Sequence, residues 1–295
     1  MIEFLVGVDG GGTGTRALLA APDGTRLGRG QAGPSALSQG IAGAWREIRI
    51  AVWAAFAAAG HRAPDDLSRC ALGAGLSGVH HQPWKDAFID AQPGFAALAV
   101  DTDAFTMLLG AHAGRPGSIV IAGTGSVAEV LRADGTRAVA SGWGFPAGDE
   151  GSGAWLGLRA MAVAQAALDG RAPAGALARK VWDHCGGANR EALLTWCAAA
   201  SQTAYGRLAP AVFEAEADDP AAAHLVGRSI CALEDMAHAL DPAGDLPLAL
   251  AGSIGQRLAP RLAAALQTRR TEPADGADVG ALTLIRRTLD RATCS

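Results

Sequence analysis

The chain has 295 residues, and 49% of them are hydrophobic, which is enough to bury the core of one large domain or two medium ones. It carries 25 Lys and Arg residues against 29 Asp and Glu, a net charge of −4. This balance excludes a broad basic face for nucleic acid, so an anionic ligand has to be held locally, by backbone dipoles and a metal ion.

The first predicted element is a β-hairpin. Residues 4–9 form an apolar strand that ends at Asp9, the glycine turn 10–15 (GGGTGT) follows, and a second strand leads to the Asp23-Gly24 turn. A strand that folds back through glycines exposes backbone N–H groups at the bend, where no side chain blocks an anion. The rival interpretation is a dinucleotide-binding loop. Its glycines open a helix, however, whereas apolar and β-branched residues here lead into a strand.

The rest of the first half predicts an α/β unit with a mixed sheet, because hairpin strands are antiparallel and crossover strands are parallel. After a Gly-Pro-Ser loop, the expected elements are a helix over 41–60, a strand over 69–76, a helix over 84–91, a strand over 95–100 and a helix over 103–112. The glycine- and proline-containing stretch 114–117 closes this unit. We therefore expect a first lobe over 1–115 and a second lobe over 116–295.

The hairpin pattern restarts at residue 118. A strand over 118–122 runs into a second Gly/Thr/Ser turn and reaches Asp134-Gly135, and the ten-residue interval from Thr to Asp is the same in both copies. Two such turns facing each other would clamp a polyphosphate. Neither lysine of the chain follows a GxxxxG pattern, so a Walker-type phosphate loop is excluded. The candidate phosphate-binding residues are Gly11, Gly12, Thr13, Thr124, Gly125 and Ser126.

The second half is richer in helix. Apolar residues recur at helical spacing from 152 to about 239. A strand over 246–251 then ends in Gly252-Ser253, before a last helical stretch through 267. The tail beyond residue 280 is basic and compatible with a final helix, for which packing back on the first lobe is one alternative.

Duplicated α/β halves with glycine turns are the layout of the acetate and sugar kinase, heat-shock chaperone and actin superfamily. Four strings resemble, in consistent order, the phosphate, interdomain and adenosine segments of the N-acetylglucosamine kinase-like family, which is grouped with the BadF/BadG/BcrA/BcrD ATPases. The resemblance implies an α/β protein with two ribonuclease H-like lobes (the actin-like ATPase fold), a cleft between them and a second lobe enlarged by helices. The strings are GVDGGGTGTRALL, IVIAGTGSVA, SGWGFPAGDEGSGAWLG and LALAGSIG.

Two aspartates are candidates for the chemistry. Asp9, before the glycine turn, can hold the hydrated Mg²⁺ that bridges ATP phosphates, since this ion needs only one or two carboxylates; the alternative is an ordinary turn aspartate. Asp103 begins a predicted helix, where an N-cap is the ordinary role. The resemblance implies instead that Asp103, followed by Ala104, is the base that accepts the sugar hydroxyl's proton. Asp101, two residues away, stays the alternative.

The resemblance also implies a sugar site. Asp149 would hydrogen-bond a sugar hydroxyl, although the run around it could equally be a helix-capping region. Family sugar kinases usually follow the Gly-Pro-Ser loop with an asparagine, but Ala36 stands there in this chain. A contact from Ser35, Ser38 or Gln39 could replace it. Trp143 is interpreted as a packing residue. The expected sugar-binding residues are Ser35, Gly78, Asp103, Gly142 and Asp149, and the expected adenosine-binding residues are Gly252 and Ser253.

The resemblance therefore implies a kinase that uses ATP and Mg²⁺ to phosphorylate an amino sugar such as N-acetylglucosamine or glucosamine. One alternative is an ATPase that activates a partner reductase or dehydratase through cysteine-held iron–sulfur chemistry. Against it, the cysteines lie at no suitable glycine-rich positions. A nucleotide-binding regulatory protein is a third alternative. The cysteines, odd in number and without a CxxC pair, are Cys70, Cys185, Cys197, Cys231 and Cys294.

Partners and location follow from what the chain lacks. No run approaches 18 apolar residues and the start has no basic leader, so we expect a cytoplasmic protein without a membrane or nucleic-acid partner. A homodimer stays open. His80-His81 and Asp183-His184-Cys185 have no partner cluster at metal spacing and are interpreted as structural or surface features.

Overall fold

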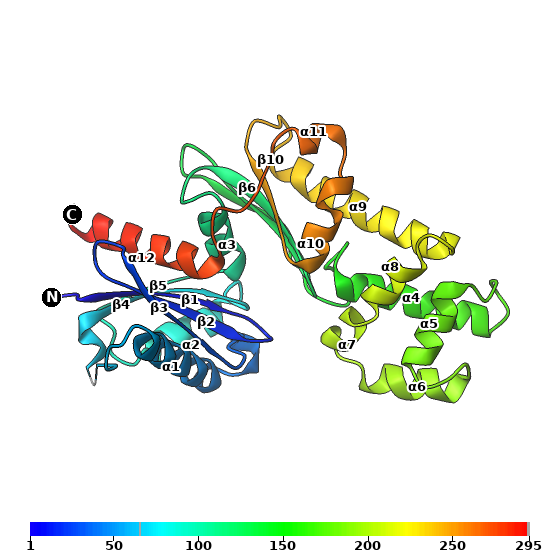
Figure 1. The fold of residues 1–295 in the computed structure, drawn as a ribbon, viewed down its shortest axis with the longest axis horizontal. Coiled ribbons are helices and arrows are strands. Elements are labelled where there is room, and N and C mark those ends of the chain that lie inside the picture. Colours follow the sequence, from blue (N-terminus) through cyan, green and yellow to red (C-terminus); the bar gives the residue numbers. More distant parts are fainter. Residues whose placement is uncertain (65, 294–295) are drawn as a thin grey trace. The chain divides into compact units, whose positions relative to one another are not determined.

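The computed structural model describes residues 1–64 and 66–293 (Figure 1). The chain divides into two compact units. The first consists of Met1–Gly117 together with the chain from Glu272 onward, and the second of Ser118–Thr271. Within the described residues, no helix is long and apolar enough to cross a membrane.

The first unit is built on a five-stranded sheet in the order β3-β2-β1-β4-β5. The hairpin pairs β1–β2 and β2–β3 are antiparallel, whereas β1–β4 and β4–β5 are parallel, which confirms the predicted mixed sheet. The register places Asp9 beside Gly75, and Gly75 beside Asp101, across three neighbouring parallel strands. The strands are β1 (Phe4–Gly10), β2 (Thr15–Ala20), β3 (Arg26–Ala32), β4 (Cys70–Leu76) and β5 (Ala97–Asp101).

In the described part of this unit, the sheet is covered by the α-helices α1 (Ile41–Ala58), α2 (Gln82–Asp90), α3 (Asp103–Ala111) and α12 (Ala277–Thr293). Figure 1 shows α1 and α2 on one face and α3 and α12 on the other. The last helix, α12, packs on β1, β4 and α3. Glycines allow this close approach, since a Cβ at Gly7 would lie 2.1 Å from the carbonyl oxygen of Asp278. The tail thus belongs to the first unit, because Leu282 and Ile285 bury their side chains in its core.

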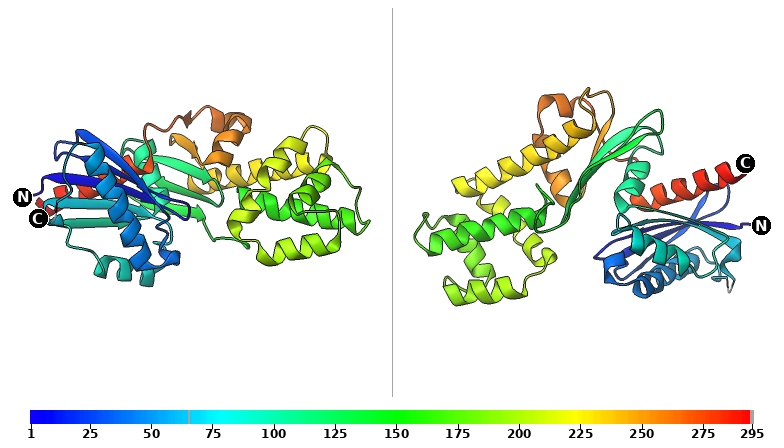
Figure 2. Two further views of the ribbon diagram at one scale, coloured as in Figure 1. Left: turned by 60° about the horizontal axis from the view of Figure 1, so that its bottom comes forward. Right: turned by 180° about the vertical axis from the view of Figure 1, so that it is seen from behind.

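The second unit has its own five-stranded sheet, in the order β10-β9-β6-β7-β8. Strand β9 runs parallel to both β6 and β10, and β7–β8 is antiparallel. The strands are β6 (Gly117–Ala122), β7 (Ser126–Leu131), β8 (Arg137–Ser141), β9 (Leu248–Ala251) and β10 (Arg270–Thr271). The helix-rich composition of this half is confirmed, and the helices pack into one large core with the sheet (Figure 2). They are α4 (Gly153–Leu168), α5 (Ala176–His184), α6 (Arg190–Ala199), α7 (Gln202–Gly206), α8 (Ala209–Ala215), α9 (Pro220–Leu240), α10 (Ser253–Leu258) and α11 (Ala264–Gln267).

The sequence repeat is a structural repeat. In the first copy the backbone N–H of Thr25 donates to Asp23 Oδ1 at 2.8 Å, and in the second that of Thr136 donates to Asp134 Oδ1 at 2.9 Å. The glycine after each aspartate has a positive φ, 97° for Gly24 and 84° for Gly135. The two copies therefore build the same aspartate turn at the same distance from their glycine turns.

Candidate active site

The first glycine turn joins β1 to β2. Gly11 donates its N–H to Gly14 O at 3.0 Å, and its own carbonyl oxygen accepts from the backbone N–H groups of Ser35 and Ala36. The loop at Ser35 and Ala36 thus holds the turn through the carbonyl oxygen of Gly11. Within residues 1–64 and 66–293, the N–H groups of Gly12 and Thr13 have no protein acceptor, which leaves them for an anion.

The second turn, at residues 123–125, joins β6 to β7 and is built on the same plan. The start of α4 supplies the support, since the N–H groups of Gly153 and Ala154 donate to Gly123 O at 2.8 Å and Thr124 O at 3.1 Å. In the described chain, the N–H groups of Thr124 and Gly125 also lack a protein acceptor. The first N–H groups of α4 therefore act on the turn rather than on a ligand.

Asp9 ends β1 and lies 3.2 Å from Arg16, with 19% of its side chain exposed. The pKa of Asp9 is raised to about 6, chiefly by burial; the charge of Arg16 opposes this rise, and the carboxylates of Asp103 and Asp278 add to it. Asp278 is a contributor that the sequence did not reveal, because it comes from α12. A carboxylate whose pKa is raised in this way is a suitable ligand for a divalent cation. The positive charge of the cation would offset both the burial of Asp9 and the repulsion from the neighbouring carboxylates.

Asp103 is the first residue of α3 and is not the N-cap. That role belongs to Thr102, whose Oγ1 accepts from the N–H of Phe105 at 2.9 Å, so the N-cap alternative for Asp103 is wrong. Asp103 Oδ1 accepts from the N–H of Ala104 at 3.0 Å. Burial raises the pKa of Asp103, while the Ala104 N–H and the charge of His80 lower it. A capped helix start thus carries a carboxylate that can accept a proton.

The register explains why these groups lie together. β1, β4 and β5 are parallel, so their carboxyl ends share one edge of the sheet, with Asp9 on β1, Gly78 after β4, and Asp103 after β5. His80 also follows β4, and its charge acts on Asp103. The interpretation of His80 as a structural or surface residue did not include this effect, although its position after the carboxyl end of a neighbouring strand was a usable signal.

Ser35 lies beneath the first turn. It is 1% exposed, its Oγ is 2.7 Å from Thr15 Oγ1, and a Cβ added at Gly10 would lie 2.1 Å from that Oγ. Its hydroxyl therefore packs against the turn. Ser38 and Gln39, the other two candidates to replace the missing asparagine, are exposed. Gly78 has a φ of 94°, a conformation that favours glycine.

The adenosine candidate Gly252 lies beside the second turn. Its φ is 77°, and a Cβ there would lie 2.3 Å from the carbonyl oxygen of Ala122. Ser253, exposed, begins α10 directly after it. The parallel pairing of Ile121 with Ala251 carries the ends of β6 and β9 to the same level, which brings these two predicted segments together.

Asp149 also lies against the second turn. It is 5% exposed, has a φ of 61°, and accepts from the N–H of Ser126 at 3.3 Å through Oδ1 and from Gln202 Nε2 at 2.7 Å through Oδ2. Ser126 is thus engaged within the protein. Its carbonyl accepts from the N–H of Gly142 at 3.1 Å, so the structure joins three predicted residues in one network. Gln202 is a member that the sequence analysis missed, since nothing in its local pattern marks it.

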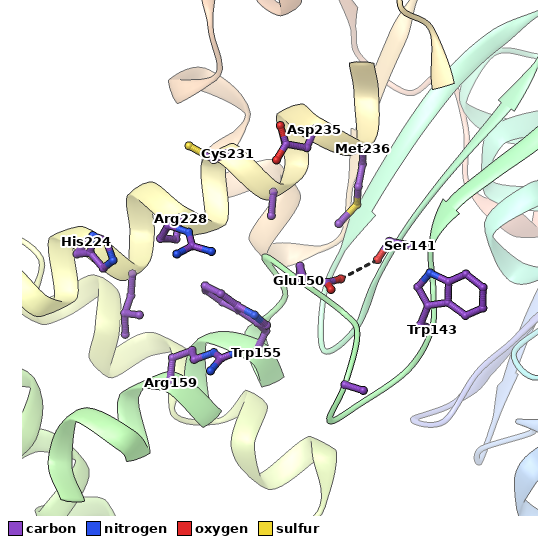
Figure 3. A pocket seen from close by; sticks show the side chains of 13 residues that line it. Ser141, Trp143, Glu150, Trp155, Arg159, His224, Arg228, Cys231, Asp235 and Met236 are labelled. Atoms are coloured by element: carbon purple, nitrogen blue, oxygen red, sulfur yellow. Dashed lines mark hydrogen bonds between the residues drawn. The ribbon is translucent and has the colours of Figure 1, made fainter. Parts of the chain in front are cut away.

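The loop between β8 and α4 borders a cavity of about 750 Å³ in the second unit. Figure 3 shows Trp155 and Arg159 of α4 and Arg228 of α9 around it, with Trp143 on the loop. The side chain of Trp143 is 84% exposed, so its interpretation as a packing residue is wrong. A large exposed aromatic ring next to Gly142 is available to a ligand instead.

In the described residues, no group of three or more His, Cys, Asp or Glu side chains could enclose a metal ion. Mg²⁺ keeps several waters and binds through few carboxylates, so Asp9 beside a phosphate turn fits it. Cys70, Cys185, Cys197 and Cys231 are free thiols, and Cys294 lies outside the described residues.

Three comparisons place the chain among known proteins. It is 33% identical over 282 residues to the glucosamine kinase GspK of Vibrio cholerae, covering 95% of each chain. It matches the solved structure of a proposed N-acetylglucosamine kinase from Chromobacterium violaceum with a TM-score of 0.92 and 47% identity, over 96% of this chain and 99% of that one.

At 12% identity and a TM-score of 0.52, the activator of 2-hydroxyisocaproyl-CoA dehydratase from Clostridium difficile shares the fold, with 98% of this chain and 96% of that one covered. These likenesses confirm the predicted two-sheet α/β architecture of the actin-like ATPase fold. The model of the BadF/BadG/BcrA/BcrD ATPase family matches residues 6–257, and the chain therefore belongs to that family.

Proposed function

We propose that this protein is an ATP-dependent kinase that transfers the γ-phosphoryl group to a hydroxyl of an amino sugar, glucosamine or N-acetylglucosamine. The observation that carries the proposal is the set of groups at the carboxyl edge of the first sheet. A half-buried carboxylate at a capped helix start, Asp103, acts electrostatically on a second one, Asp9, beside a turn with free N–H groups. The amino-sugar kinases named above, which cover nearly the whole chain, support the substrate class.

Each residue has a defined part in this reaction. Asp103 accepts the proton of the sugar hydroxyl as the new O–P bond forms and the bond from the γ-phosphorus to the β–γ bridging oxygen breaks, which gives ADP and a sugar phosphate. The N–H groups of Gly12, Thr13, Thr124 and Gly125 hold phosphate oxygens. Asp9 would hold Mg²⁺, which when bound neutralises phosphate charge. Asp149 binds a sugar hydroxyl, since its two oxygens offer about four acceptor positions and the N–H groups of Ser126 and Gly144 and the Gln202 amide occupy three of them.

The test is a coupled ADP-release assay over hexoses, hexosamines and sugar acids. We expect ADP release that depends on glucosamine or N-acetylglucosamine, with a stoichiometric sugar phosphate as the second product. ATP hydrolysis that no sugar stimulates would contradict the proposal and favour the activator alternative. A single assay thus separates the two functions that this fold accommodates.

A further inference from the structure

We propose that Gln202 is a positioning residue for the sugar site, which fixes the Asp149 carboxylate through α7. The inference rests on the proposed function, because Asp149 is given its sugar-binding role there. The contact itself is direct: Gln202 Nε2 lies 2.7 Å from Asp149 Oδ2. Within the described residues, the donors to Asp149 are the backbone N–H groups of Ser126 and Gly144 and this one side-chain amide from the helical region.

Asp149 needs such a holder because its own backbone does not favour its position. Its φ of 61° lies in the left-handed region, which costs a non-glycine residue free energy unless its surroundings enforce it. The Ser126 N–H holds one carboxylate oxygen and Gln202 holds the other. With both oxygens anchored, the direction of the remaining acceptor positions is fixed before a sugar arrives, which is what a preorganised site requires.

The helix that carries Gln202 is itself firmly placed. Ser201 caps α7 by accepting from the N–H of Ala204. Tyr205 is 9% exposed, and its ring lies 5.3 Å from that of Phe145 and 5.0 Å from that of Trp196. A Cβ at Gly157 would lie 1.8 Å from the carbonyl oxygen of Tyr205, so α7 and α4 are in close contact. Gln202 therefore presents its amide from a rigid element.

The same short helix also reaches the phosphate turn. A Cβ at Gly206 would lie 3.4 Å from Thr124 Cγ2, so the end of α7 borders the turn while its start holds Asp149. Because Phe145 belongs to the loop that also carries Asp149, α7 contacts that loop at two points. Of these two contacts, the one from the Gln202 amide is polar and the one between Tyr205 and Phe145 is aromatic. A substitution of Gln202 therefore removes a contact with Asp149 without leaving a cavity in the core.

Electrostatics supplies an independent readout. Burial raises the pKa of Asp149 and the neighbouring Glu150 adds to this, whereas the Ser126 N–H, the Gln202 amide and the Gly144 N–H lower it. All three donors favour the charged carboxylate. Loss of the Gln202 amide must therefore raise the pKa of Asp149. As the pH is lowered, the carboxylate is then protonated sooner than in the wild type, and sugar binding that needs the charged form is lost at a higher pH. A residue with a merely structural role would leave this profile in place.

The experiment measures steady-state kinetics and thermal melts for Gln202→Ala, with Gln165→Ala as the matched control. Gln165 is an exposed residue of α4 whose amide lies 3.9 Å from Cys197 Sγ. A hydrogen bond to a carboxylate is worth enough to predict a rise of about tenfold in the KM for the sugar. We expect the KM for ATP to change less than about twofold, and the low-pH limb of kcat/KM for the sugar to move to higher pH. Gln165→Ala should match the wild type.

A double-mutant cycle with Asp149→Asn tests whether Gln202 acts through Asp149. We expect Gln202→Ala to add less than about twofold on the Asp149→Asn background, because the two residues work as one unit. The isosteric Gln202→Glu keeps the shape and removes the donor, so it should reproduce the loss above neutral pH even if the alanine variant folds poorly.

Two results separate the claims. A wild-type protein that phosphorylates no sugar contradicts the proposed function, and the role of Gln202 falls with it. An active wild type with an unchanged sugar KM in both Gln202 variants, or with losses that multiply in the cycle, contradicts the role of Gln202 alone. A rise confined to the KM for ATP also overturns it, because Asp149 would then serve the phosphate turn.

Discussion

At the scale of single residues, the structure separates aspartates that the sequence could not. Asp101 and Asp103 flank Thr102, and their positions differ because Thr102 is the N-cap of α3. Asp101 Oδ1 accepts from the N–H of Thr102 at 2.8 Å, on the strand side of the cap. Asp103 lies on the helix side, half-buried, and its charge acts on Asp9. The position of Asp103 was predictable from the strand-to-helix pattern, whereas the true cap was not.

The first prediction concerns these two residues. Asp103→Asn removes the proton acceptor and keeps the shape, so kcat should fall by about 10²- to 10⁴-fold with little change in the KM for ATP. Asp101→Asn weakens a local hydrogen bond worth about 1 kcal/mol and should act mainly on the melting temperature. Steady-state kinetics and melts on both variants check this. An inactive, normally melting Asp101→Asn beside an active Asp103→Asn would exchange their roles.

The second prediction concerns Asp9. Its pKa rises from 3.8 to about 6 on folding, so the folded state binds the proton more tightly and stability without metal should fall as pH rises from about 4 to about 6. The shift corresponds to at most about 3 kcal/mol. Asp9→Asn should abolish turnover yet flatten this decline. Chemical denaturation in EDTA at pH 4.5 and pH 7.5 measures it, and the same pH slope in variant and wild type would refute the argument.

At the scale of elements, turns and strands were easier to predict than contacts. The two hairpins and the parallel strands followed from alternating apolar runs and glycines, which act locally. The carbonyl contacts that α4 makes with the second turn, and the hold of α7 on Asp149, were not predictable. They join residues far apart in sequence, such as Gln202 and Asp149, whose local patterns carry no sign of each other.

A third prediction compares two glycines with nearly equal φ. Gly252→Ala places a Cβ 2.3 Å from Ala122 O at a φ of 77°, whereas Gly244→Ala meets open space at a φ of 76°. Strain alone should cost Gly244→Ala about 1 kcal/mol. Gly252→Ala should lose more stability and raise the KM for ATP, because the second turn must shift. Chemical denaturation and ATP kinetics check this. If both variants lose the same free energy of unfolding and Gly252→Ala keeps the wild-type KM for ATP, Gly252 does not contribute to the nucleotide site.

At the scale of the whole molecule, the chain makes two units, and one of them is discontinuous. The restart of the hairpin pattern at Ser118 marked the first change of unit, and the structure divides after Gly117. The return of α12 was left open by the sequence. The sequence of this tail does not indicate which part of the protein it packs on. In the structure it lies against β1 and β4, where glycines leave room for the helix.

The fourth prediction concerns α12. Ile285 is 0% exposed in the core of the first unit, so Ile285→Ala should lower the stability of that unit by about 2–5 kcal/mol. Thr288→Ala, on the exposed side of the same helix, is the control. Hydrogen exchange with peptide resolution should show faster exchange in β1 and β4 and unchanged exchange in β6 and β7. Uniform acceleration across both sheets would mean that the two units unfold as one.

The return of α12 also sets the order in which the nascent protein is completed. The ribosome makes β1 before the whole of Ser118–Thr271, but it makes α12, which covers β1, after that segment. The second unit is one continuous segment and has all its residues before α12 exists. Domains fold as units during synthesis. The first unit therefore finishes folding after the second, because its sheet stays uncovered on the α12 side until that helix has been made.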